Sequence, residues 1–212
     1  MRKHDPKICI YCGGFACERE HVPPRCLMER PFPNNLQTLP VCDKCNRSFS
    51  LDEEYFITFL SLIGAAKSLN AKVEECGKVD RALSYSSALD DKIINNLSVS
   101  ECGKVMLTPE LHRIRRVIKK IALGLYVLRY NQIPSIDSIE GGDIFPSENE
   151  HSHPTNYSMP THIRRLLTET HTIVQPNIFT YAFVKPSNFK NNIYCVMELH
   201  STAWGFAYLP IS

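Results

Sequence analysis

Two pairs of cysteines constrain the fold of this 212-residue chain more than any other feature of its sequence. Cys9 and Cys12 form one CxxC motif, Cys42 and Cys45 form another, and 29 residues separate the two pairs. Two residues between thiolates allow one backbone turn to direct both sulfurs at a single ion, and two such turns complete a tetrahedral zinc site. The spacing therefore predicts that residues 8–48 fold around a structural Zn²⁺.

Other roles for these cysteines agree less well with the sequence. Four unrelated buried cysteines would not repeat the same spacing, and a redox CxxC does not require a second matched pair. Disulfides are not expected, because the nine cysteines are an odd number and the N-terminus leads into no apolar signal core. No apolar run is long enough to cross a bilayer. We expect a cytoplasmic protein that has no membrane contact.

The polar residues around the cysteine pairs follow a defined order. Glu20-His21-Val22-Pro23 comes after the first pair, Asn34-Asn35-Leu36 precedes the second, and Asn46 directly follows Cys45. This order resembles the HNH nuclease superfamily, in the subgroup stapled by a four-cysteine zinc. The resemblance covers about residues 8–56 and implies a ββα-metal module that cuts DNA, with RNA as an alternative substrate.

The resemblance also implies a role for each polar residue. His21 is expected to be the general base, and Glu20 and Asn46 are expected to hold a catalytic Mg²⁺ or Mn²⁺. Asn35, with Asn34 as an alternative, would fix the loop that holds His21. The chemistry is consistent, because a neutral imidazole with a pKa near 6.5 accepts a proton from water at pH 7. A divalent ion would stabilise the oxygen that leaves.

Basic side chains provide candidate phosphate contacts. Arg25 and Arg47 lie close to the motifs in sequence. Residues 108–130 hold six basic residues and one acidic residue. Helical spacing places four of the basic residues opposite the apolar face: Arg113, Arg116, Lys119 and Lys120. This stripe is either a nucleic-acid contact or the solvated face of a helix that packs on the core. The two arginines near the motifs have the same two interpretations.

The whole chain is expected to be an α+β protein with four regions. These are a zinc-stapled nuclease module (1–56), a helical region (57–133), an acidic loop with four prolines and Gly141-Gly142 (134–165) and an antiparallel β region with one buried face (166–212). One helix should have Ser50 or Asp52 as its N-cap, and another should have Thr108 as its N-cap and end near Tyr130. Shorter helices are expected near 71–83 and 87–97, and strands over 178–184, 193–200 and 203–209.

The sequence thus predicts a metal-dependent endonuclease. The alternative is a non-catalytic zinc module that binds nucleic acid or protein, in which Glu20 and His21 are structural residues. No pattern in the sequence indicates the target sequence or the oligomeric state.

Overall fold

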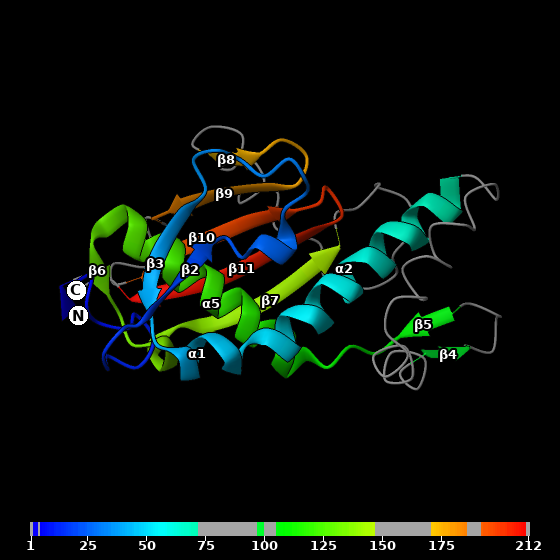
Figure 1. The fold of residues 1–212 in the computed structure, drawn as a ribbon. Helices are drawn as coiled ribbons and strands as arrows, with labels where there is room; N and C mark the ends of the chain where they lie inside the picture. The colour runs from blue at the N-terminus through cyan, green and yellow to red at the C-terminus, as the bar shows by residue number, and fades with distance from the viewer. Residues whose placement is uncertain are drawn as a thin grey trace.

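A computed structural model of the chain describes residues 2–3, 5–71, 97–99, 105–146, 171–185 and 192–210. The chain is an α+β protein, as predicted (Figure 1). Its two long helices are α2 (Ser50–Ala71) and α5 (Leu111–Tyr130). Within the described ranges, no helix combines the length and the apolar character that a bilayer-spanning segment requires.

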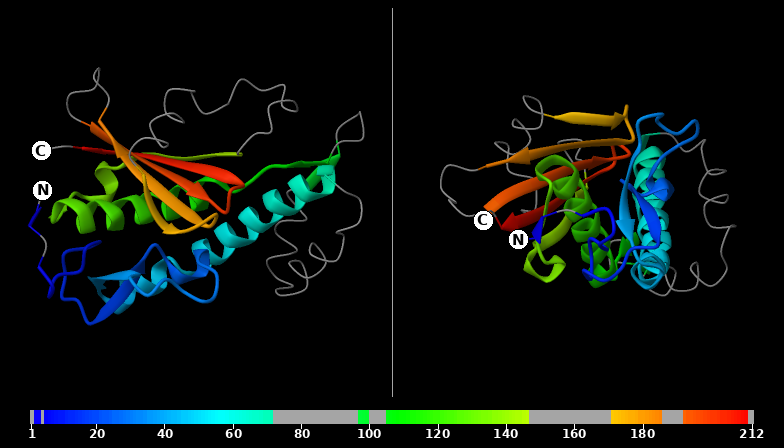
Figure 2. Two further views of the ribbon diagram at one scale, coloured as in Figure 1. Left: turned by 90° about the horizontal axis from the view of Figure 1, so that it is seen from above. Right: turned by 60° about the vertical axis from the view of Figure 1, so that its left-hand side comes forward.

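Helix α5 lies between two layers of the molecule (Figure 2). On one side is an antiparallel sheet with the strand order β7-β11-β10-β9-β8. Its strands are β7 (Glu140–Pro146), β8 (Thr172–Gln175), β9 (Phe179–Val184), β10 (Asn192–Leu199) and β11 (Ala203–Pro210). On the other side are the β2–β3 hairpin and helix α2. Because both sides of α5 are covered, it is the central element of the fold.

The N-terminal layer is built from an antiparallel hairpin followed by helices. Strand β2 (Glu18–Val22) pairs with β3 (Gln37–Val41), and the register places His21 opposite Thr38. The connection contains the 3₁₀ turn η1 (Arg25–Leu27). Helix α1 (Asp43–Ser48) follows β3 after one residue, and α2 begins after one further residue, Phe49. Successive residues of β2 point to opposite faces, so this hairpin has an inward face toward α5 and an outward face.

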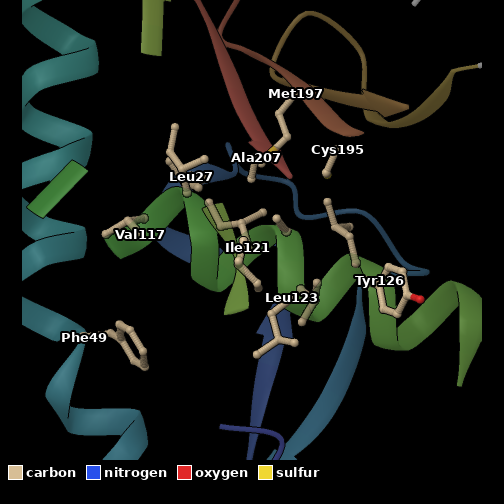
Figure 3. Packing of buried hydrophobic residues seen from close by; sticks show 14 of the residues in the cluster. Leu27, Phe49, Val117, Ile121, Leu123, Tyr126, Cys195, Met197 and Ala207 are labelled. Carbon is tan, nitrogen blue, oxygen red and sulfur yellow. The ribbon is translucent and has the colours of Figure 1, made fainter. Parts of the chain in front are cut away.

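One apolar core joins the two layers through α5 (Figure 3). Every residue of α5 from Ile121 to Val127 is buried, so this part of the helix has no solvent face. Cys195, Met197 and Ala207 of the sheet point toward one side of α5, and Leu123 points toward the hairpin strands. Close approach requires glycine, since a Cβ atom on Gly124 would lie 2.8 Å from a methyl carbon of Val22. The Val22 side chain of the hairpin therefore packs directly against the backbone of α5.

Shorter elements complete the described structure. Two-stranded pairings join β1 (Arg2–Lys3) to β6 (Gln132–Ile133) and β4 (Leu97–Val99) to β5 (Val105–Leu107). A second 3₁₀ turn, η3 (Ile136–Ser138), precedes β7. The expected helices near 71–83 and 87–97 fall almost entirely on 72–96, outside the described residues.

Most element predictions agree with the structure. Helix α2 begins at Ser50, and the three predicted C-terminal strands correspond to β9, β10 and β11. Helix α5 ends at Tyr130 as expected, but it begins at Leu111 instead of using Thr108 as its N-cap. The cause is a tertiary contact, because the backbone N–H of Glu110 donates to the hydroxyl of Tyr55 at 2.8 Å.

Two predictions for the C-terminal half were wrong. The segment 134–165 is not a loop throughout, since residues 140–146 form the edge strand β7. Gly141 and Gly142 suggested a turn, but both have positive φ at a strand irregularity, and a Cβ on Gly142 would lie 2.7 Å from the Arg115 carbonyl oxygen. The sheet also has two apolar faces rather than one, because Ala182, Val196 and Phe206 form a second buried cluster.

Candidate functional site

The four cysteines of the two CxxC pairs meet at one point. The thiol sulfurs of Cys9, Cys12, Cys42 and Cys45 all lie within 4.8 Å of one another, and those of Cys12 and Cys42 are 3.7 Å apart. Tetrahedral zinc with Zn–S bonds of about 2.3 Å requires neighbouring sulfurs about 3.8 Å apart. The four thiols therefore fit a metal ion such as zinc, and in the described part of the chain this is the one such cluster of acidic, Cys and His side chains.

In each CxxC pair, a backbone N–H group donates a hydrogen bond to one of the two sulfurs. The N–H of Gly14 donates to the Cys12 sulfur at 3.4 Å and lowers the pKa of that thiol to about 7. The N–H of Cys45 donates to the Cys42 sulfur at 3.4 Å, where Cys42 caps helix α1. Burial raises the pKa of Cys9 and of Cys45. A bound cation would supply the positive charge that favours the thiolate form of these two cysteines.

The outward face of the hairpin carries the predicted general base. His21 is partly exposed, and burial followed by the nearby charge of Arg25 lowers its pKa below the usual 6.5. The imidazole is therefore neutral at pH 7 and able to accept a proton. Arg25 is exposed and lies 5.4 Å from the ring centre of Phe32. Arg19 shares the outward face, and its guanidinium donates to the Thr38 carbonyl and hydroxyl at 2.8 and 2.7 Å.

The inward face of the hairpin holds Glu20 in a buried ion cluster. Glu20 is 7% exposed, and its Oε1 forms an ion pair with the Lys120 ammonium, which is 2% exposed. Its Oε2 accepts a hydrogen bond of 2.6 Å from the hydroxyl of Tyr11. The same ammonium also pairs with Glu53 at the start of α2. The Glu20 carboxylate is therefore engaged at both oxygens, by Lys120 of α5 and by Tyr11 of the segment before β2.

The other residues of the predicted catalytic ion site also have different surroundings. The Asn46 side-chain amide donates to the Glu18 carboxylate at 2.5 Å. Glu20 and His21 project from opposite faces of β2. Asn35 is exposed and lines a cavity of about 200 Å³ between the start of β3, α5 and the β8–β9 edge, with Arg129 and Tyr181. Both carboxylate oxygens of Glu20 therefore already have partners, whereas only the amide nitrogen of Asn46 is engaged.

The basic residues of α5 do not form one open stripe. Arg113 is 11% exposed, and Arg113 and Arg116 both pair with Asp52 of α2, at 2.8 and 2.5 Å. Lys120 is buried, which corrects its expected place on an exposed face. Lys119 is partly exposed. Outside α5, Arg47 is 79% exposed and pairs with Asp43 at 2.6 Å. Of the predicted phosphate contacts, Arg25 and Arg47 are the two on open parts of the N-terminal layer.

Sequence reasoning missed the acidic partners on α2. Asp52 was considered only as a possible cap of a helix, and Glu53 was given no partner. One signal pointed to a second buried face on α5, because Leu123 and Val127 interrupt the polar side of the helix. An apolar residue on that side indicates that another layer covers it.

Comparisons with known proteins gave no relative for this chain. No protein-family model matches it, and neither the curated proteins nor the solved structures contain a match. Any functional assignment therefore depends on the chemistry of the cysteine cluster and of the two hairpin faces.

Proposed function

We propose that this chain is a nuclease of the HNH type, which hydrolyses phosphodiester bonds in DNA with His21 as general base and a structural Zn²⁺ in the four-cysteine site. The observation that carries the proposal is the outward face of the hairpin. There a partly exposed His21, with a pKa below its usual value, lies close to the exposed guanidinium of Arg25. The hairpin followed by α1 also has the strand–strand–helix order that the resemblance implies.

The proposed reaction uses groups of this chain at each step. His21 accepts a proton from a water molecule, and the water oxygen attacks the phosphorus. The bond from phosphorus to the 3′-oxygen breaks, and the departing oxygen takes a proton from solvent. Arg25 binds the phosphate oxygens and offsets their negative charge in the transition state. No step is assigned to a divalent ion at Glu20 and Asn46, because both carboxylate oxygens of Glu20 already have partners within the protein.

A second candidate function is supported by the ion cluster. Glu20 paired with Lys120 and Tyr11 is a structural residue, as expected for a non-catalytic zinc module. In that case the exposed Arg25 and Arg47 would bind the nucleic-acid backbone, and His21 would have no role in chemistry.

A cleavage assay separates the two functions. Purified protein is incubated with plasmid DNA, or with RNA, in the presence of Mg²⁺, Mn²⁺ or a chelator. We expect cleavage that falls about 10² to 10⁴-fold in His21→Ala, the usual contribution of a positioned general base. His112→Ala, an exposed histidine of α5, is the matched control and should cut as fast as the native protein. If native protein binds nucleic acid but does not cleave it under any of these conditions, the non-catalytic function is correct. If native protein cleaves and His21→Ala cleaves as fast, His21 is not the general base and the proposed mechanism is wrong.

A further inference from the structure

The Lys120 ammonium is enclosed by side chains from three elements. It pairs with Glu20 of β2 and Glu53 of α2, and it lies 4.7 Å from the ring centre of Phe49. Lysine has three N–H donors and no acceptor. Two carboxylates and the negative face of an aromatic ring therefore account for the surroundings of this cation.

The two carboxylates converge as ligands of a metal ion would. Glu20 Oε1 and Glu53 Oε1 both contact a single cationic atom, and they come from segments more than thirty residues apart. Divalent cations such as Mg²⁺ and Mn²⁺ are held by carboxylate oxygens in this way. In this protein the cation between the two carboxylates is the Lys120 side chain of α5.

We propose that Lys120 is a built-in cation at the Glu20–Glu53 pair, and that it excludes a divalent metal ion from Glu20 in the native protein. A metal ion there would occupy the space of the ammonium. Moving the ammonium away would leave a charge in the core without its partners, which is strongly unfavourable. Tyr11 further restricts the site, because its hydroxyl already donates to the second Glu20 oxygen.

Lys120 cannot easily move away, because α5 is fixed along its length. Arg113 and Arg116 hold its first turns to Asp52 of α2. One turn after Lys120, Gly124 is in contact with Val22 of the same strand that carries Glu20. Helix α5 is therefore fixed both before and after Lys120, and this holds the ammonium beside Glu20. This inference goes beyond the proposed function and does not depend on nuclease activity.

Manganese binding to zinc-loaded protein tests the inference. Bound Mn²⁺ is counted by electron paramagnetic resonance in native protein, Glu20→Gln, Lys120→Met and the Lys120→Met/Glu20→Gln double variant. Native protein and Glu20→Gln should bind Mn²⁺ equally weakly. Lys120→Met should gain one site per chain with affinity about tenfold or more above native, because two carboxylates then lack a cation. The double variant should lose that site, and Lys120→Arg, which keeps the charge, should not gain it.

Two results would overturn the inference. One is a native Mn²⁺ site that disappears in Glu20→Gln, since the metal would then reach Glu20 in spite of Lys120. The other is a folded Lys120→Met protein that gains no Glu20-dependent site. If Lys120→Met fails to fold, the native and Glu20→Gln pair decides the question alone. Cleavage is not measured in this experiment, so its outcome is separate from that of the nuclease proposal.

Discussion

Replacing Gly124 with alanine tests how tightly the hairpin is seated on α5. A Cβ at this position would lie 2.8 and 2.9 Å from the two methyl carbons of Val22. Alanine inside a helix is favoured over glycine by about 0.8–1.0 kcal/mol. Overpacking of a well-packed core costs about 1–3 kcal/mol. The crowding against Val22 should outweigh the helix preference of alanine, so we expect Gly124→Ala to lower the free energy of unfolding by about 0–2 kcal/mol.

In a Val22→Ala variant, the Gly124→Ala substitution should stabilise the protein instead of destabilising it. Val22→Ala removes both crowding methyl groups and leaves the Val22 Cβ position, which is an ordinary 3.5 Å from the new methyl group. In that background Gly124→Ala should raise the free energy of unfolding by about 1 kcal/mol, the helix preference alone. The difference between backgrounds is a coupling energy that urea unfolding of the four proteins measures directly. If Gly124→Ala stabilises both the native protein and Val22→Ala equally, the Val22 methyl groups do not crowd the Gly124 position.

Three further predictions concern the metal site, the hairpin and the α2–α5 contact. Cys42→Ser should lose zinc and several kcal/mol of stability, because metal binding there is folding energy; elemental analysis should find one zinc per native chain, and zinc-free native protein with unchanged stability would contradict this. Arg25→Gln should raise the pKa of His21 toward 6.5, which an NMR titration of the imidazole measures. The fall in cleavage rate at acid pH should then begin at a higher pH. If the His21 titration does not move, Arg25 is not a cause of the lowered pKa. Burial opposes ionisation of Asp52, but hydrogen bonds from Arg113 and Arg116 outweigh it and leave the pKa of Asp52 lowered, so its ionised form stabilises the fold above about pH 4. Asp52→Asn should therefore cost about 1–3 kcal/mol at pH 7, with the difference from native narrowing as pH falls below about 4, and a constant difference would contradict the assignment.

Local patterns predicted the parts of the fold that local forces determine. The apolar spacing of α2 and α5 and the alternation of β9 to β11 are repeated over many residues, so their positions were correct within a few residues. The paired cysteine spacing likewise brought four sulfurs together. These signals lie within single elements or within short turns.

Contacts between distant elements could not be read in the same way. Lys120 is polar by type, and helical spacing assigned it to solvent; its burial depends on Glu20 and Glu53, which lie 100 and 67 positions earlier. Strand β7 was missed because a Gly-Gly pair is common in turns, whereas here Gly142 allows an edge strand to pass close to the backbone of α5 at Arg115. Only the tertiary arrangement distinguishes these alternatives.

The central position of α5 has a consequence for the order of events during synthesis. The hairpin leaves the ribosome well before residues 111–130, yet its inward face is completed by Gly124 and Lys120 of that helix. The cysteines can capture a metal early, since all four precede residue 46. Until α5 emerges, however, Glu20 has no ammonium beside it and Val22 has no helix to cover it. A nascent chain stalled before residue 111 should therefore be metal-loaded but still accessible to proteases in strand β2, and protection should appear only when α5 has left the exit tunnel.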